Sequence, residues 1–75
     1  LVIPVHYAGR ACDREALLGL KARYGFKVME DAAHALGAAY ADGGPIGSNG
    51  GADAVVFSFH PVKPVTTGEG GVIVT

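Results

Sequence analysis

The sequence has 75 residues and a formal net charge of −1, and 49% of its residues are apolar. Its basic residues are scattered and no apolar run reaches membrane-spanning length, so we expect no nucleic-acid or membrane partner, but a small molecule and a reducing cytoplasm. A single cysteine, Cys12, excludes an internal disulfide, and one hydrophobic core is marginal at this length. Because the chain begins at Leu1 without a Met and ends on an apolar run, we expect residues 1–75 to be part of one larger domain, with no complete second domain.

Two parallel strands are expected in the first part of the chain. Residues 1–6 form a short apolar run that suits a strand buried on both faces, although Pro4 argues against a fully paired ladder there. Residues 26–31 read as the second strand. A helix between them makes a strand, helix, strand unit, and such a crossover places the two strands parallel to each other.

That helix is expected to begin after Asp13, a plausible N-cap, and to run to about Tyr24, with Gly25 as the stop. Its sequence predicts one apolar and one solvated side. The apolar side is expected to hold Ala16, Leu17, Leu18, Leu20 and Tyr24, and the solvated side Arg14, Glu15, Lys21 and Arg23.

The second part of the chain predicts a long loop and two further strands. A small-residue segment with His34 leads into a glycine-rich loop over residues 40–53, and loops of this length are usually functional or disordered. Strands are expected over residues 54–59 and 71–75, and the short, non-helical connection between them favours antiparallel pairing. The predicted fold class is therefore α/β, with a mostly parallel sheet and an antiparallel last strand.

Polar side chains are expected to gather where the parallel strands end. His6, Asp31 and the run from Ser58 to Lys63 all fall at the carboxyl ends of their strands, where open α/β sheets bind ligands. Lys63 lies between two prolines, in a setting unlike that of a solvated surface lysine. The sequence therefore brings a carboxylate and an amine to one rim of the sheet.

Pyridoxal 5′-phosphate needs both of these groups. A lysine amine forms a Schiff base with its aldehyde, and a carboxylate keeps its ring nitrogen protonated. Lys63 and Asp31 are the candidates for these roles. Ser58 is a candidate hydrogen-bond donor to the phosphate, and His34 is a candidate for contact with the ring. Each of these residues also has a purely structural explanation when taken alone, so the pairing of Asp31 with Lys63 carries the hypothesis.

Three segments resemble the signature motifs of the DegT/DnrJ/EryC1/StrS aminotransferases. They are EDAAHALG at 30–37, FSFHPVK at 57–63 and TTGEGG at 66–71, and residues 5–9 and 47–51 are similar to the family as well. The resemblance implies part of the large domain of a pyridoxal phosphate-dependent transferase with the aspartate aminotransferase-like fold. It is greatest to the branch that aminates UDP-linked 4-keto-6-deoxy-N-acetylhexosamines, the UDP-4-amino-4,6-dideoxy-N-acetyl-altrosamine transaminases.

The resemblance also implies roles for individual residues. It makes Lys63 the Schiff-base lysine, Asp31 the partner of the ring nitrogen, His34 a neighbour of the ring and Ser58 a phosphate ligand. It implies transfer of an amino group, typically from glutamate, to a nucleotide-linked keto-sugar, and a homodimer with its active site at the subunit interface, to which residues 43–51 contribute. Because the family's upstream phosphate-binding motif and small domain lie outside these residues, we expect the 75 residues alone to be inactive.

Two alternatives stay open at this point. One is a metal site built from His6, Asp31 and His34, with His60 as a further ligand. The other is a non-catalytic protein that keeps the pyridoxal phosphate fold and only binds or regulates. Cys12 is interpreted as a small buried residue, and Glu69 as part of a tight turn without a chemical role.

Overall fold

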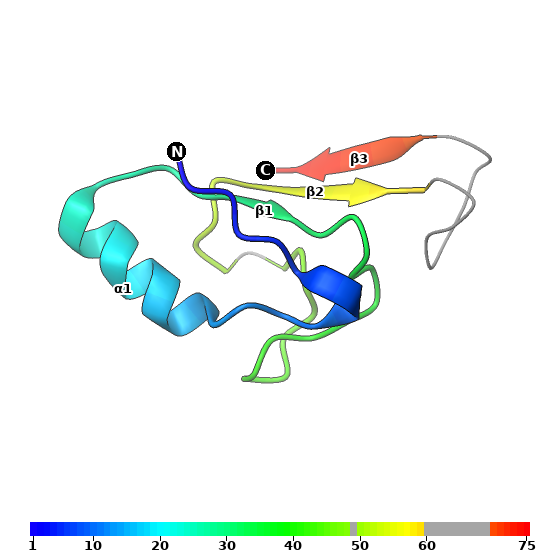
Figure 1. The fold of residues 1–75 in the computed structure, drawn as a ribbon, viewed down its shortest axis with the longest axis horizontal. Helices are drawn as coiled ribbons and strands as arrows, with labels where there is room; N and C mark the ends of the chain where they lie inside the picture. The colour runs from blue at the N-terminus through cyan, green and yellow to red at the C-terminus, as the bar shows by residue number, and fades with distance from the viewer. Residues whose placement is uncertain (49, 60–69) are drawn as a thin grey trace.

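The computed structural model describes residues 1–48, 50–59 and 70–75. In chain order it contains a 3₁₀ turn η1 (Tyr7–Gly9), helix α1 (Arg14–Tyr24) and strands β1 (Met29–Asp31), β2 (Ala54–Ser58) and β3 (Gly71–Val74). The strands form one mixed sheet in the order β1-β2-β3, with β1 and β2 parallel and β3 antiparallel to β2. Helix α1 and the long loop before β2 lie on one side of this sheet (Figure 1).

The predicted α/β fold, the parallel crossover and the antiparallel last strand are confirmed, but the first predicted strand is not continuous. Residues 1–6 make only two isolated parallel bridges beside β1, from Val2 to Val28 and from Val5 to Asp31. The amides of Val2 and His6 donate to Lys27 and Asp31. Between these two hydrogen bonds, a regular ladder would have a third one donated by residue 4. Pro4 has no N–H to donate, so the ladder is broken there.

The observed strands are also shorter than their predicted ranges. The second predicted strand began at Phe26, but β1 begins at Met29, and the third and fourth each end one residue earlier than expected. The register pairs Glu30 with Val55 and Asp31 with Val56. Residues that are paired across two neighbouring strands point to the same face of the sheet. Glu30 therefore shares a face with Val55, and Asp31 shares the opposite face with Val56.

Helix α1 begins and ends as predicted. The carboxylate of Asp13 accepts from the amide of Ala16 at 3.1 Å, and Gly25 adopts a left-handed conformation with φ of 73°, donating its amide to Lys21 at 2.8 Å. These contacts satisfy backbone groups that a helix end leaves unpaired.

The side by which α1 packs differs from the predicted apolar side. Leu20 and Tyr24 are 48% and 65% exposed, and no residue of the helix is fully buried. The helix instead contacts the loop through Arg14, Leu18 and Lys21, which lie on one stripe at positions i, i+4 and i+7. Arg14 and Lys21 were predicted to lie on the solvated side. Hydropathy alone cannot distinguish a charged side chain that pairs across an interface from one that is solvated.

An ion-pair cluster ties α1 to the sheet. The ammonium group of Lys21 donates to the Gly51 carbonyl and to the Asp53 carboxylate, both at 2.7 Å. Asp53 also accepts from the amide of Val28 at 2.8 Å and from Lys27 at 3.4 Å. These hydrogen bonds hold the pKa of the Asp53 carboxyl well below its ordinary value.

The long loop contributes to the core through Tyr40 and Ile46, which are both buried. It folds back on itself through an antiparallel bridge between Ala39 and Pro45. Gly47 has φ of 94°, and a Cβ atom at this position would lie 2.8 Å from the ring of Phe57, so only glycine fits without displacement. The buried cluster that results consists of Ala32, Ala35, Tyr40, Ile46, Val55 and Phe57.

Within the described part of the chain, no helix is long and apolar enough to cross a membrane.

Candidate functional site

Asp31 and Ser58 lie on the same face of the sheet, at the same end. Asp31 is the last residue of β1 and Ser58 the last residue of β2, and the two strands are parallel neighbours. Asp31 is paired with Val56, and Ser58 follows Val56 by two residues, so the pleat directs Asp31 and Ser58 to one face. The prediction that these two residues meet at the carboxyl end of the sheet is therefore consistent with the register.

The carboxylate of Asp31 is held in place by its own backbone surroundings. Its Oδ1 atom accepts from the amide of Ala33 at 3.0 Å, which closes a turn directly after the strand. The backbone of Asp31 is bonded on its other side, donating to Pro4 and accepting from His6, both at 2.9 Å. One carboxylate oxygen is thus committed to the turn, while the half-buried side chain stays within reach of a ligand.

His34 lies in this turn and is exposed. The chain continues through a second turn, since the amide of Ala35 donates to Ala32 and that of Ala38 donates to Ala35. His34 therefore stands just beyond the strand end that carries Asp31. The other predicted site residues, Lys63 and His60, lie outside the described residues.

A buried polar cluster of His6, Glu30 and Tyr40 occupies the opposite face of the sheet. His6 and Glu30 are each 1% exposed, and Tyr40 is 5% exposed. The Nε2 atom of His6 and the hydroxyl of Tyr40 both donate to Oε2 of Glu30, at 2.9 and 2.5 Å. The two rings meet edge to face, with centroids 5.9 Å apart.

The protonation of this cluster follows from its hydrogen bonds. The amide of Cys12 donates to Nδ1 of His6 at 3.0 Å, so the ring proton of neutral His6 is on Nε2, directed at Glu30. Burial and the hydrogen bond to Glu30 raise the pKa of Tyr40, which keeps its hydroxyl protonated and donating. Glu30 is therefore a buried acceptor with two neutral donors.

Sequence reasoning missed this cluster, although one signal was present. Glu30 and Asp31 are consecutive residues of a strand, so one of them must point to the face opposite the other. With Asp31 assigned to the ligand face, Glu30 had to face the core and needed buried donors. Nothing in the sequence alone identified Tyr40 as one of them, because residues 40–53 were expected to form a loop that is functional or disordered.

The same alternation separates the residues of the hypothetical metal site. His6 points to the core face and is bonded to Glu30, whereas Asp31 points to the other face. Among the described residues, no group of three or more His, Cys, Asp or Glu side chains could hold a metal ion. His6 is thus a structural residue, and its inclusion in a metal site with Asp31 and His34 was wrong.

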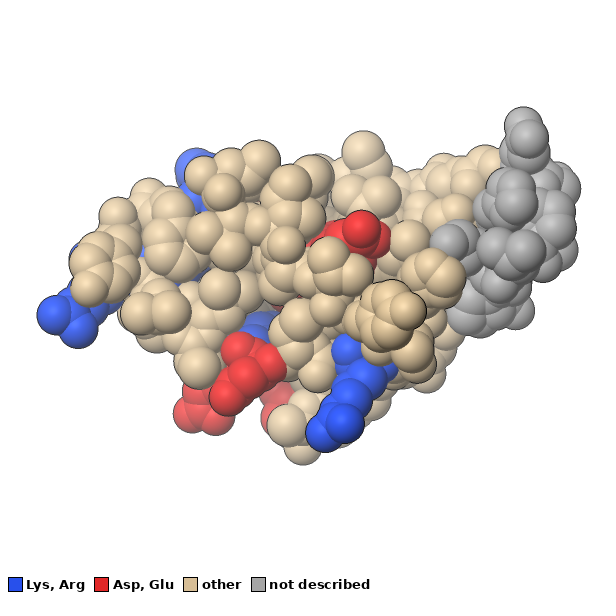
Figure 2. All heavy atoms as spheres, in the orientation of Figure 1, with Lys and Arg blue, Asp and Glu red and all other residues tan. Residues whose placement is uncertain are grey.

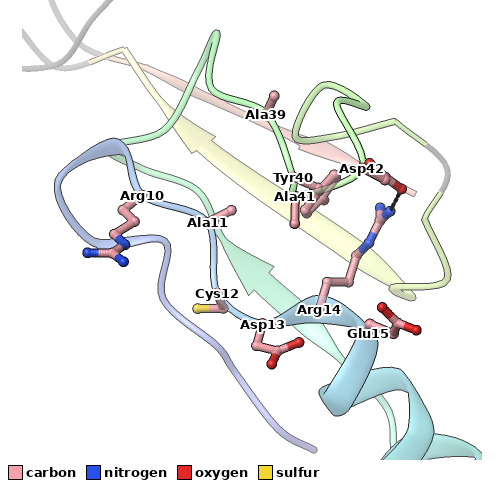
Figure 3. Close-up of a pocket in the computed structure, with 10 residues that line it drawn as sticks. All are labelled: Arg10, Ala11, Cys12, Asp13, Arg14, Glu15, Ala39, Tyr40, Ala41 and Asp42. Carbon is pink, nitrogen blue, oxygen red and sulfur yellow. Dashed lines mark hydrogen bonds and ion pairs between the residues drawn. The ribbon is translucent and has the colours of Figure 1, made fainter.

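A cavity lies beside the cluster of His6, Glu30 and Tyr40, and none of the predicted site residues line it. It has a volume of about 590 Å³ and is lined by residues 10–15 and 39–42. Arg14 stacks over the ring of Tyr40, with its guanidinium carbon 3.6 Å from the ring centroid, and donates to Asp42 at 2.8 Å. Figure 3 shows Arg14 reaching toward Asp42, while Arg10 extends away from both.

Cys12 also lines this cavity, but its thiol is not activated. The thiol donates to the carbonyl of Val5 at 2.9 Å. Burial, and after it the negative charge of Glu30, raise the pKa of the thiol, which disfavours the reactive thiolate. Cys12 is therefore interpreted as structural, although it is half-buried rather than buried as expected.

The face seen in Figure 2 is mostly uncharged, with acidic and basic side chains in small separate groups. It shows no broad patch of either sign.

Comparison with known proteins identifies the family. The chain belongs to the DegT/DnrJ/EryC1/StrS aminotransferase family, whose model matches residues 1–75. The fold agrees with that of solved members. PseC of Helicobacter pylori, an aminotransferase involved in the biosynthesis of pseudoaminic acid, is 40% identical with a TM-score of 0.89, and the match covers 97% of this chain and 19% of PseC.

Two further structures support this assignment. DesI, solved in the presence of its TDP-sugar product, is 46% identical with a TM-score of 0.86, over 99% of this chain and 18% of DesI. Spr1654 of Streptococcus pneumoniae, a sugar aminotransferase in its PLP form, is 37% identical with a TM-score of 0.81, over 96% of this chain and 21% of Spr1654. The chain thus spans about a fifth of the length of each of these proteins, and its fold is that of part of a PLP-dependent aminotransferase.

Proposed function

We propose that residues 1–75 form part of the cofactor-binding large domain of a longer pyridoxal 5′-phosphate-dependent sugar aminotransferase. The protein would transfer an amino group, from glutamate, to a keto group of a nucleotide-linked sugar. The observation that carries the proposal is the placement of Asp31 and Ser58 on one face, at the carboxyl ends of two parallel strands, in a chain of this family.

The side chains present fit the cofactor. When bound, pyridoxal 5′-phosphate supplies an electron sink for the carbon that gains or loses the amino group. The carboxylate of Asp31 would hold the ring nitrogen protonated, and the hydroxyl of Ser58 would bind a phosphate oxygen. His34, one turn beyond Asp31, would contact the ring, and Lys63 would supply the amine that holds the cofactor and then moves the proton.

The substrate class is proposed from the relatives. PseC is an aminotransferase of pseudoaminic acid biosynthesis, and DesI was solved with a TDP-sugar product. A nucleotide-linked keto-sugar is therefore the proposed amino acceptor. Within this class, the sequence around Lys63 favours the UDP-4-amino-4,6-dideoxy-N-acetyl-altrosamine transaminase branch and a role in polysaccharide biosynthesis, in the cytoplasm.

The oligomer is proposed as a homodimer. The active site would lie at the subunit interface, with residues 43–51 contributing to it. In the structure, the first part of this loop folds against the core, since Ile46 is buried and the amide of Tyr40 donates to the carbonyl of Gly44 at 2.8 Å. The residues of this loop that pack on the core would present a fixed surface to a partner.

Product analysis with the full-length protein tests this function. The protein, loaded with pyridoxal 5′-phosphate, is incubated with glutamate and a UDP-linked 4-keto-6-deoxy-N-acetylhexosamine, and the products are analysed by mass spectrometry. We expect an amino-sugar and 2-oxoglutarate in equal amounts. The Asp31→Asn variant should lose at least about a hundredfold in rate, because the amide cannot keep the ring nitrogen protonated.

The outcomes separate the proposed function from its alternatives. Cofactor binding without amino-sugar formation from any keto-sugar offered would indicate a non-catalytic binder. Full activity of Asp31→Asn would remove Asp31 from its proposed role. The matched control is Asp42→Asn, which makes the same type of substitution at a residue that lines the cavity beside α1. It should keep the parent rate.

A further inference from the structure

The short strand β1 contains two adjacent carboxylates, and only one of them can face the ligand. Glu30 and Asp31 alternate across the sheet, so a shift of the strand by one residue would exchange their faces. The three-residue strand is bonded through its backbone to residues 1–6 on one side and to β2 on the other. Backbone groups are the same at every residue and can pair again after a shift, so the register also depends on the side chains.

The cluster of His6, Glu30 and Tyr40 fixes the register from the side chains, because its two donors come from different segments that pack against β1. His6 belongs to the segment paired beside the strand, and Tyr40 belongs to the loop that covers the core face. Their N–H and O–H groups meet on one oxygen of Glu30. An apolar residue at this position would leave both donors buried and unsatisfied, which disfavours it.

The cluster also reaches the backbone of Asp31. His6 binds Glu30 through its side chain and, through its amide, the carbonyl of Asp31 at 2.9 Å. The ring of His6 is oriented by the amide of Cys12. Tyr40 is in turn held from the far side by the guanidinium of Arg14. His6 thus contacts both residues of the pair, Glu30 with its side chain in the core and Asp31 with its backbone beside the strand.

We propose that Glu30 is a positioning residue, which His6 and Tyr40 lock into the core so that Asp31 faces the cofactor. The inference rests on the proposed function for the identity of the ligand, but the lock itself is a property of the chain. Glu30 does not contact the cofactor in this account. Glu30 acts by fixing which of the two carboxylates of β1 faces the cofactor.

The lock is tested with two variants of the full-length protein. Tyr40→Phe removes one hydroxyl and keeps the ring, and Glu30→Leu keeps much of the side-chain volume while removing the acceptor. Hydrogen exchange of the cofactor-free protein, followed by mass spectrometry of the peptide over residues 28–34, reports on β1. The affinity for pyridoxal 5′-phosphate, measured by the absorbance of the cofactor, reports on whether Asp31 is directed to the proposed cofactor face.

We expect both variants to exchange about tenfold faster in this peptide and to bind the cofactor about tenfold more weakly, since one buried hydrogen bond is worth on the order of a tenfold change. Glu30→Gln keeps one oxygen to accept from His6 and Tyr40 and should restore most of the affinity. The matched control, Tyr24→Phe, removes the same hydroxyl from an exposed site on α1 and should change neither measurement.

Parent-like exchange and affinity in Tyr40→Phe would overturn the proposal. It would also be overturned if Glu30→Leu bound the cofactor as well as Glu30→Gln, because packing alone would then suffice. Should Glu30→Leu fail to fold, the comparison of Tyr40→Phe with Tyr24→Phe still decides. If the parent protein binds no pyridoxal 5′-phosphate, the proposed function fails, while the exchange measurement continues to test the lock.

Discussion

At the scale of single residues, three acidic side chains have different environments. Asp31 is bound to a turn, Glu30 is buried between neutral donors, and Asp53 is bonded to two lysines and an amide. Of Glu30 and Asp31, only Asp31 lies on the face that we propose for the cofactor. Position on the pleat, rather than residue type, decides which of these two carboxylates faces that side.

Asp53 makes the stability of the fold depend on pH. Its carboxylate accepts from Lys21, Lys27 and Val28, and its pKa is lowered from an ordinary value of 3.8. A lowered pKa stabilises the folded state above the ordinary value, and this contribution is lost as pH falls through and below it. We expect the urea midpoint of the parent protein to decline as the pH falls below about 5, with Asp53→Asn declining less over the same range.

The variant Lys21→Met serves as the control, because it removes the ammonium group that lies 2.7 Å from the Asp53 carboxylate and leaves the carboxylate unchanged. Its urea midpoint should also depend less on pH than that of the parent. Parallel pH profiles for the parent and both variants would show that Asp53 does not couple to folding.

At the scale of elements, the helix ends, the parallel crossover and the antiparallel last strand could be predicted, because local signals specify them. Asp13 and Gly25 are strong capping residues, and the connection before β3 is too short for a parallel return. The packing side of α1 could not be predicted, because it depends on partners in a loop distant in sequence. Lys21 contacts Gly51 and Asp53, thirty or more residues away.

The candidate site could be predicted in part for the same reason. The positions of Asp31 and Ser58 at strand ends follow from the alternating pattern of their strands. The His6, Glu30 and Tyr40 cluster required knowledge of how the long loop returns to the sheet. The return of the loop depends on single glycines such as Gly47. The packing role of Gly47 cannot be predicted from the sequence, because it depends on the position of the Phe57 ring beside it.

Gly47 offers a test of this loop closure. The substitution Gly47→Ala imposes a Cβ atom at positive φ and within 2.8 Å of the Phe57 ring. We expect it to destabilise the full-length protein by about 1–2 kcal/mol from the backbone and by a further 1–3 kcal/mol from overpacking, measured by urea unfolding.

Gly37→Ala is the matched control. Gly37 also has positive φ, at 88°, but a Cβ atom there would meet nothing within 4 Å. It should therefore show the backbone cost alone. Equal losses in the two variants would mean that contact with Phe57 does not constrain the loop.

At the scale of the whole molecule, the described residues cover mainly one face of the sheet. The core face holds the loop and helix α1, whereas Ile3, Val5 and Ile73 remain exposed at 48%, 48% and 63%. By the register, these three residues lie on the same face as Asp31. The match to about a fifth of each relative agrees with a unit that functions within a longer chain.

The central claim concerns the residue that holds the cofactor. The full-length protein is loaded with pyridoxal 5′-phosphate, reduced with sodium borohydride, digested and mapped by mass spectrometry. Reduction makes the link between cofactor and amine permanent. The account predicts one pyridoxyl label, on Lys63, and its loss in Lys63→Arg but not in Lys27→Arg. A label on another lysine, or no label at all, would contradict it.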